Sequence, residues 1–365
     1  MILSGKRGAI ASRVPNGGEM ELLRELSKEY KTISIVGMAK NAGKTTALNF
    51  LIEEAMDEGV RLGITSTGRD GESTDLVTET EKPRVYLYEG TLVSVPRKLY
   101  ELAEAGLEII SMSNYRTALG ELLLCEVKEE GYVQIAGPVA TADTRKLCTE
   151  MFSCGAELVL VDGAIDRKSV AAPESSDAII LSTGAVISRD IAKVVKETAH
   201  VVSLYSLPVL DDSDAKETIL SIIDENRIAL MRRKAVLDPE PFDVELMDLK
   251  TGLGAGRLID EAITDDVEYV FIPGAITNSI MESINPAKFK NTVFILKDPT
   301  KIFIDSVTWK QLVKRGLDMR VIQNIKVCAV TVNPISPEGY SFDSDMLQAE
   351  VRKAIPDIPV IDVRK

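Results

Sequence analysis

The sequence predicts an α/β fold in two parts, a domain built on a mostly parallel sheet and a second, smaller α/β domain. Short, continuously apolar runs alternate with helical segments along most of the chain, a pattern typical of parallel strands covered on both faces. The length of 365 residues also exceeds the size of one ordinary hydrophobic core. We place an N-terminal extension and helix at residues 1–30, the first domain at 31–210 and the second at 211–365.

The expected elements of the first domain follow from its apolar runs. An amphipathic helix over 19–30 precedes the first strand, and the next helix stops at Gly59. The strands of the parallel sheet, separated by helices and not paired as hairpins, are predicted at residues 32–36, 60–65, 133–136, 139–142, 158–161 and 178–181. Residues 81–131 are less regular, and we expect an added antiparallel strand at 84–88 and a helix at 96–105.

The same alternation resumes in the second domain, after the pattern of strands and helices is interrupted near residues 207–212. A charged helix is expected there at about 214–233. Strands are predicted at 244–249, 269–272, 293–296, 327–332 and 360–363, with helices at 256–263, 303–315 and 344–354. Strands and helices that alternate in this way again predict an α/β layer structure.

The charge of the chain limits its partners. Lys and Arg number 43 against 56 Asp and Glu, a net charge of −13, and no basic run offsets it. Because such a surface repels phosphate backbones and anionic lipids, we expect no nucleic-acid and no membrane partner. No apolar stretch reaches the length of a membrane span or of a signal-peptide core.

The cysteines and the single histidine indicate the cellular location of the protein and exclude one kind of metal site. Four cysteines without CxxC spacing predict reduced thiols in a cytoplasmic protein. The single histidine, His200, excludes a histidine-rich zinc site. Because His200 sits between two apolar runs, we expect it to be structural.

A phosphate-binding loop is the most specific motif of the chain. The first strand leads into the run Gly37-Met38-Ala39-Lys40-Asn41-Ala42-Gly43-Lys44-Thr45-Thr46. Backbone N–H groups of such a loop, and of the helix that follows, point at nucleotide phosphates. Gly43 permits close approach, Lys44 places an ammonium between the outer phosphates, and the Thr45 hydroxyl can join the coordination of Mg²⁺. We therefore predict that Gly37 and residues 40–46 bind a nucleotide.

The loop departs from the strict pattern G-x4-G-K-[ST]. Five residues separate Gly37 from Gly43, and Met38 stands where the first glycine is expected. Lys40 is either a second phosphate contact or a surface lysine; it lies four residues before Lys44, whereas the signature lysine of MinD-type loops lies five before. The chain has no Asn-Lys-x-Asp run, which favours ATP over GTP.

This spacing resembles the dethiobiotin synthetase-like and cobyrinate amidase-like (SIMIBI) branch of P-loop proteins, whose first glycine also lies seven residues before the lysine. A second run, Glu157–Ala164, resembles the strand of that family that ends in an acid and a glycine. The family's acid assists Mg²⁺, so the resemblance implies a metal-supporting and catalytic role for Asp162. The alternative is a plain strand-end turn at Asp162-Gly163.

The loop after the second predicted strand, residues 66–75, is a further candidate. In a parallel sheet this strand end lies beside the phosphate loop, so its acids are expected near the γ-phosphate. Asp70 is the candidate to hold Mg²⁺ or to orient the attacking water, with Glu72 and Asp75 as substitutes. The alternative is a solvated acidic loop.

Four other polar segments have less specific signals. Residues 143–145 either contact a substrate or partner or cap a helix. Residues 330–340 form either a contact loop for the nucleotide or a partner, or a rigid turn. Residues 271–277 lead into a helix whose N-terminus could receive an anion, and 166–169 stay unassigned.

Over the whole chain, three runs resemble the NTPase subunits of reactivases for cobalamin-dependent aminomutases, of the type that serves lysine 5,6-aminomutase. These runs are the phosphate loop, Val161-Asp162-Gly163 and Asn333-Pro334-Ile335-Ser336-Pro337-Glu338-Gly339. The resemblance implies an ATPase that uses ATP and Mg²⁺ and works with a second, MutS-like ATPase subunit to release inactivated cobalamin. The alternatives are an ATP-dependent ligase of dethiobiotin synthetase type, with a substrate pocket beside Lys44, and a nucleotide-binding scaffold without hydrolysis.

Overall fold

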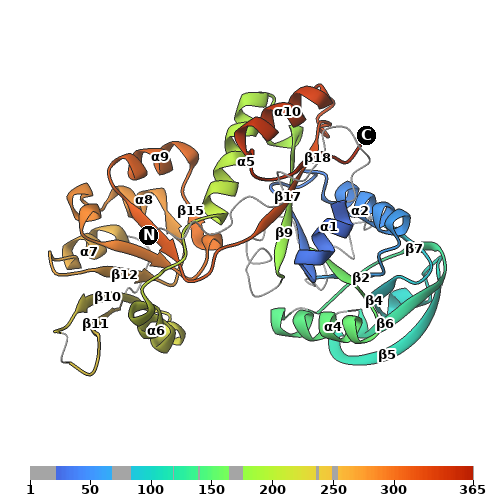
Figure 1. Cartoon of the computed structure of the whole chain (residues 1–365), viewed down its shortest axis with the longest axis horizontal. Coiled ribbons are helices and arrows are strands. Elements are labelled where there is room, and N and C mark those ends of the chain that lie inside the picture. The colour runs from blue at the N-terminus through green and yellow to red at the C-terminus, as the bar shows by residue number, and fades with distance from the viewer. Residues whose placement is uncertain are drawn as a thin grey trace, which may run out of the picture. The chain divides into compact units, whose positions relative to one another are not determined.

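The chain divides into two compact units (Figure 1). The first comprises the residues up to Ala199 together with Lys326–Lys365, and the second comprises His200–Ile325. The computed structural model describes residues 22–67, 84–117, 119–138, 140–163, 176–235, 238–248 and 254–364. Each unit has its own sheet and its own core, so the predicted α/β class is confirmed.

The first unit is built on a nine-stranded, mostly parallel sheet. Its strands are β1 (Thr32–Gly37), β2 (Leu62–Ser66), β4 (Leu92–Pro96), β5 (Gly106–Thr117), β6 (Gly120–Glu129), β8 (Leu158–Asp162), β9 (Ala178–Gly184), β17 (Val327–Asn333) and β18 (Val360–Asp362). Their order is β18-β17-β9-β1-β8-β2-β4-β6-β5. The strands from β18 to β4 are parallel, and the antiparallel pair β6 and β5 extends one edge.

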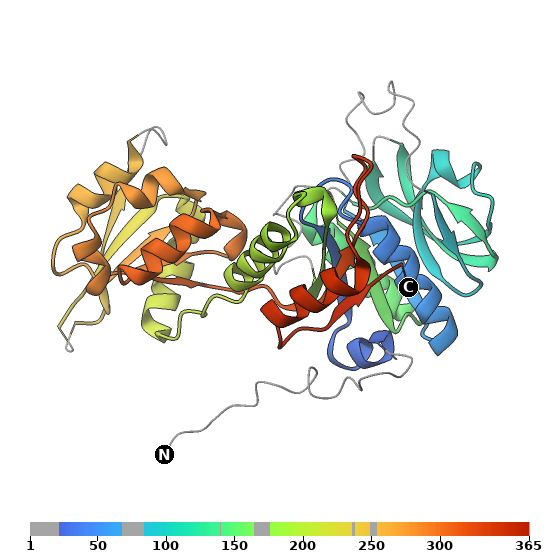
Figure 2. The same cartoon turned by 90° about the horizontal axis from the view of Figure 1, so that it is seen from above.

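Helices cover both faces of this sheet (Figures 1 and 2). They are α1 (Leu22–Glu29), α2 (Lys44–Glu58), α3 (Arg97–Tyr100), α4 (Thr141–Ser153), α5 (Ile191–Tyr205) and α10 (Ser344–Ala354). In β8, Leu158 and Leu160 join one core with α1 and α2, while Val159 and Val161 join another with α4. Successive strand side chains point to opposite faces, so a strand that is apolar at every position needs a cover on each side.

Part of the irregular segment was predicted and part was not. The expected antiparallel strand at 84–88 is confirmed as β3 (Val85–Leu87), which pairs with β7 (Gly131–Val133). The helix expected at 96–105 is only the four-residue α3, and the long hairpin β5–β6 fills much of the segment instead. The strand expected at 139–142 is wrong, because Thr141 already begins α4.

The observed division of the chain differs from the predicted boundary at 210. We expected β17, α10 and β18 in the second domain, but β17 pairs in parallel with β9 and belongs to the first unit. All seven residues of β17 are buried, as in a central strand covered on both faces. Because an apolar run does not specify which sheet it joins, the sequence pattern alone could not place it.

The second unit contains a five-stranded mixed sheet with the order β11-β10-β12-β14-β16. Its elements are α6 (Ser213–Ile222), β10 (Ile228–Arg233), β11 (Phe242–Met247), α7 (Ala255–Ala262), β12 (Tyr269–Ile272), β13 (Ile276–Thr277), α8 (Asn278–Glu282), β14 (Val293–Leu296), β15 (Ile302–Phe303), α9 (Ser306–Lys314) and β16 (Asp318–Val321). The helix expected over about 214–233 is confirmed only in its first half: α6 ends at Ile222, and β10 follows a turn in which Asn226 has a left-handed φ of 52°.

This unit has a core on each face of its sheet. Leu230, Val270 and Phe294 pack on one side, and Met231 and Phe271 pack on the other. The strands predicted at 269–272 and 293–296 are therefore apolar at every position, because both faces of the sheet are covered, as in the first unit. No helix within the described ranges is long and apolar enough to cross a lipid bilayer.

Candidate functional site

The predicted phosphate loop connects the end of β1 to the start of α2. Residues 38–43 lie between the two elements, and Gly43 is the N-cap of α2. Its φ of 97° and the φ of 64° at Asn41 are left-handed values, which glycine and asparagine adopt more readily than other residues. The loop is held against the neighbouring strand by the Met38 N–H, which donates to the Ser182 carbonyl at 2.9 Å.

The N-terminus of α2 is open for an anion. Gly43 supplies no side-chain cap, so N–H groups in the first turn of this 15-residue helix are left for a ligand. Thr45 and Thr46 lie in that turn and are partly buried. Lys40 and Asn41 are exposed, so both interpretations of Lys40, phosphate contact and surface lysine, stay predictions.

Lys44 and Asp162, which were predicted from separate motifs, meet beside this turn. In the parallel register of β1 and β8, Ile35 lies opposite Asp162, which brings the carboxylate to the edge of the sheet where the loop begins. Lys44 Nζ lies 2.7 Å from Asp162 Oδ1 and also donates to the Gly163 carbonyl. The Lys44 side chain is 13% exposed and that of Asp162 is 29% exposed, so both charges can be reached by a ligand.

The Asn333-Pro334 loop, which we had assigned to the second domain, contacts the phosphate loop. β17 ends at Asn333, opposite Gly184 of β9. A Cβ added to Gly43 would lie 2.8 Å from the Cβ of Asn333, so glycine is required for this contact. The signal that could have found it is the run Val327–Asn333, an apolar strand ended by a polar residue, as β8 is.

Sequence reasoning missed the contacts that hold this loop in place. Arg189 Nη2 lies 3.3 Å from Glu338, and the guanidinium carbon lies 5.0 Å from the centre of the Tyr340 ring. The Tyr340 hydroxyl donates to the Ala185 carbonyl. Together these contacts tie the loop after β17 to the segment after β9, and no local pattern pairs these residues in sequence.

The acidic loop after β2 is described only at its start. Asp70, Glu72 and Asp75 lie outside the described residues. Residues 166–169 lie outside them too. Ser66 stands opposite Asp162 in the β2–β8 register, and the Thr67 N–H donates to the Asp162 carbonyl at 3.1 Å. Within the described part of the chain, the Thr67 hydroxyl is buried without a hydrogen-bond partner, which is costly for a polar group.

Two other predictions can be placed. Asp143 and Thr144 lie in the first turn of α4, and Ala140, not either of them, occupies the N-cap position. In the second unit, His200 Nε2 lies 2.9 Å from the Ile304 carbonyl oxygen, where the backbone holds the ring in place as expected for a structural histidine.

The chain matches no protein-family model, no curated protein and no solved structure at a significant level. The chemistry of the site therefore rests on its geometry: an open helix N-terminus, Lys44, Asp162 and a buried hydroxyl at the carboxyl edge of the sheet, where α/β proteins bind ligands. The described residues contain no cluster of three or more potential metal-ligating His, Cys, Asp or Glu side chains. Magnesium shared by a hydroxyl, one carboxylate and substrate phosphates needs no such cluster, so the residues fit this ion.

Proposed function

We propose that this chain binds a nucleoside triphosphate, preferably ATP, together with Mg²⁺ and hydrolyses it. The observation that supports the proposal is the contact between the Lys44 ammonium and the Asp162 carboxylate beside the open N-terminus of α2. Phosphoryl transfer needs a cation on the outer phosphates and an acid that supports the metal. Both charges lie in one place here.

Each residue then has a defined task. Lys44 moves its ammonium from Asp162 to the outer phosphates, and N–H groups of the first turn of α2 bind phosphate oxygens. Thr45 and Asp162 hold Mg²⁺, which neutralises phosphate charge when bound. Because the charge of the Lys44 ammonium is shared with Asp162, metal-free nucleotide competes with that carboxylate for it. The role of Asp70 in holding the metal or the attacking water stays a prediction.

Substitutions at the two charges test this proposal. Lys44→Ala should weaken ATP binding about 10- to 100-fold, because a hydrogen bond to a charged group contributes about 1.5–3 kcal/mol. Asp162→Asn should reduce Mg²⁺-dependent phosphate release while it tightens the binding of Mg²⁺-free ATP, because the competitor for the Lys44 charge is removed. A fluorescent ATP analogue, with and without a chelator, and a phosphate-release assay measure both effects.

Two further lysine variants make the comparison specific. Lys193→Ala removes an exposed lysine of α5 and should change nothing. Lys40→Ala decides between a phosphate contact, which lowers affinity, and a surface lysine, which does not. Wild-type affinity in Lys44→Ala would contradict the proposal, and ATP affinity without any phosphate release would favour the scaffold alternative.

We further propose that hydrolysis serves a cobalamin-dependent aminomutase, together with a MutS-like second ATPase subunit. Support comes from the arrangement of the three runs that resemble such reactivases: the phosphate loop, Asp162-Gly163 and the Asn333-Pro334 loop meet at one edge of one sheet. A loop that touches Gly43 can respond when a nucleotide binds and present the change to a partner.

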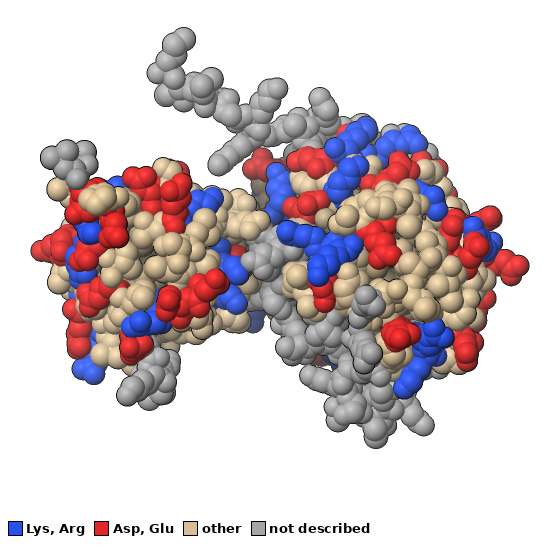
Figure 3. Space-filling view, turned by 90° about the horizontal axis from the view of Figure 1, so that it is seen from below, with Lys and Arg blue, Asp and Glu red and all other residues tan. Residues whose placement is uncertain are grey.

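The surface is in keeping with a protein partner. On the face drawn in Figure 3, Lys and Arg are interspersed with Asp and Glu, and the coloured residues form no continuous basic stripe for a nucleic acid. Phosphate release from ATP and GTP, measured alone and with an aminomutase and a co-encoded ATPase, tests the assignment. Stimulation by the partners is expected, and its absence with every such partner would overturn the reactivase role without affecting the nucleotide proposal. Turnover that instead depends on a small carboxylate metabolite would favour the ligase alternative.

A further inference from the structure

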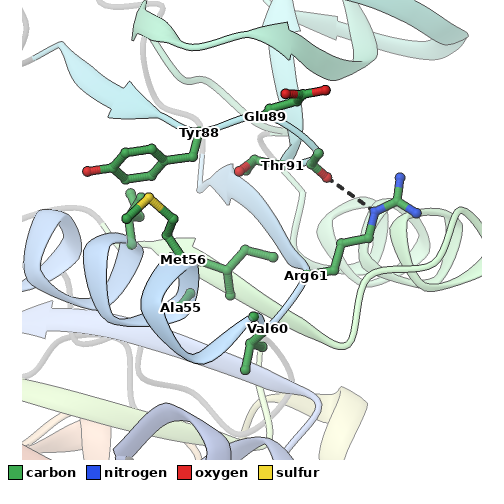
Figure 4. Close-up of a pocket in the computed structure, with 11 residues that line it drawn as sticks. Ala55, Met56, Val60, Arg61, Tyr88, Glu89 and Thr91 are labelled. Carbon is green, nitrogen blue, oxygen red and sulfur yellow. Dashed lines mark hydrogen bonds between the residues drawn. The ribbon is translucent and has the colours of Figure 1, made fainter.

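A separate pocket lies at the opposite end of α2 from Lys44 (Figure 4). The last turn of α2, the residues after it and the turn between β3 and β4 enclose about 240 Å³. The 15 residues of α2 separate it from the phosphate loop by roughly 20 Å at about 1.5 Å per residue. Pockets for drug-sized ligands span about 300–1,000 Å³, so this one suits a single side chain better than a nucleotide.

The pocket has an apolar side and a polar side. Met56 lies beneath the ring of Tyr88, Val60 lines the same pocket farther from the ring, and Glu89 and Thr91 line the other side, with the Glu89 carboxylate directed away from Met56 (Figure 4). Met56 is 49% exposed, so this wall opens to solvent. A group that enters the pocket therefore meets a thioether and an aromatic ring along its length and a carboxylate at the rim.

The one cation among the lining residues is already engaged. Arg61 Nε donates to the Gly90 carbonyl at 3.2 Å, and Arg61 Nη2 lies 3.2 Å from Glu126 Oε1. The guanidinium is thus held at the side of the pocket by its own partners. Glu89 has no ion-pair partner among the residues that the structure describes.

The surroundings add negative charge. Glu53 and Asp57 stand one turn apart on the exposed side of α2, and neither forms an ion pair within the described part of the chain. The carboxyl end of α2, capped by Gly59, contributes the negative pole of the helix dipole. Burial raises the pKa of Tyr88, and the charges of Glu53, Glu130 and Asp57 raise it further.

The ring of Tyr88 is held by other tyrosines. The Tyr86 ring centre lies 5.3 Å from that of Tyr88 and 5.2 Å from that of Tyr132, both in edge-to-face contact. A ring fixed in this way loses little freedom when a ligand binds against it.

We propose that this pocket receives the side chain of a lysine presented by a partner protein. The ammonium is attracted by the Tyr88 ring and by the carboxylates of Glu53, Asp57 and Glu89. The methylene stem packs against Met56 and Val60. Because the wall at Met56 is half exposed, the pocket encloses only the end of a chain, which favours a group delivered on a protein surface. The net charge of −13 attracts basic surfaces in the same way.

The probe is Nα-acetyl-lysine N-methylamide, titrated into the full-length protein labelled with ¹³C at its methionine methyl groups. We expect the Met56 signal, assigned with Met56→Leu, to shift with a dissociation constant of about 1–10 mM. The double variant Glu53→Gln/Asp57→Asn should bind about fivefold more weakly, since two exposed charge contacts contribute about 1 kcal/mol together. Glu217→Gln, at an exposed helical acid of the second unit, should leave the shift unchanged.

Two other probes can overturn the proposal. If the neutral Nα-acetyl-norleucine N-methylamide shifts Met56 at the same concentrations as the lysine probe, the pocket does not recognise charge. If 1,5-diaminopentane binds more than about tenfold tighter than the lysine probe, the pocket takes a free diamine and the partner-lysine assignment is wrong. The absence of any shift also refutes it. Far-UV circular dichroism verifies that the charge variants are folded.

Discussion

At the scale of single residues, Lys44 and Asp162 form an ion pair at the candidate site. The Lys44 ammonium neutralises a carboxylate that is 29% exposed and that would otherwise repel a nucleotide. A hydrogen bond to the Gly163 carbonyl keeps the ammonium at the same place. Under the function proposed above, nucleotide and Mg²⁺ would each take one member of this pair, so the binding of either one would make room for the other. This reciprocity is the physical basis for expecting them to bind together more tightly than either alone.

Glu54 is the residue whose protonation should affect stability near neutral pH. Its carboxylate accepts N–H bonds from Leu22 at 2.7 Å and Leu23 at 3.3 Å, at the start of α1. Burial, and then repulsion by Glu58, raises the pKa of Glu54 from 4.5 to about 7. A group whose pKa is raised in the folded state stabilises the fold fully below its unfolded value. That stability is lost as the pH rises through about 7.

The variant Glu54→Gln keeps an acceptor for the two N–H groups and removes the titration. We expect it to exceed the wild type by on the order of 1–3 kcal/mol at pH 8, with the difference shrinking as the pH falls to 5. Thermal unfolding across this pH range measures the effect. Glu53→Gln, at the exposed neighbouring residue, serves as the control. Parallel curves for Glu54→Gln and the wild type would show that Glu54 does not titrate in this range.

Among the elements, those with a strong local pattern could be predicted from sequence. β1, β8 and β9 are short apolar runs that need cover on both faces, which makes them visible without a structure. The hairpin of β5 and β6 was missed because its alternation is broken. Its register shifts between Ile109 and Ser111, and Ile109 and Ile110 are both exposed.

In the candidate site, too, residues that belong to a local motif could be predicted from sequence and long-range contacts could not. Lys44 and Asp162 could be predicted because each belongs to a motif that its own strand, loop and helix define. The contact of Asn333 with Gly43 could not, because the whole second unit lies between them in the chain. Whether a distant strand joins a sheet depends on the packing of the whole unit, which no local spacing encodes.

The variant Gly43→Ala tests this contact between the start of α2 and the end of β17. A left-handed φ of 97° costs a non-glycine residue about 1–2 kcal/mol, and the added Cβ would also lie 2.8 Å from that of Asn333. We therefore expect a larger loss of stability than in Gly59→Ala. That control has a left-handed φ of 69° and no atom within 4 Å of the added Cβ.

A second substitution separates the two effects at Gly43. Asn333→Gly removes the Cβ that Gly43→Ala would meet, so the double variant should recover the steric part of the loss and retain the backbone part. Denaturant unfolding of the single and double variants gives the coupling free energy. Strict additivity of the two substitutions would show that the loops do not touch.

For the whole molecule, the order of the chain has a consequence for folding. The chain leaves the first unit near Ala199, builds the second, and returns at Lys326 to add β17 and β18 to the first sheet. The first unit thus needs both ends of the described chain, whereas the second unit is continuous. Because the hydrophobic clusters formed by the described residues of the two units have no residue in common, we expect each unit to unfold in its own transition.

The single tryptophan makes this expectation measurable. Trp309 lies in α9 and packs against the core of the second unit, so its fluorescence follows that unit alone. ATP with Mg²⁺, bound at Lys44, should stabilise the first unit by about 2.7 kcal/mol at a hundredfold excess over the dissociation constant. Circular dichroism should then show one transition moving to higher temperature while the Trp309 transition stays in place, and Lys44→Ala should abolish the movement. A Trp309 transition that shifts with nucleotide as far as the circular dichroism does would mean that the two units unfold as one cooperative structure.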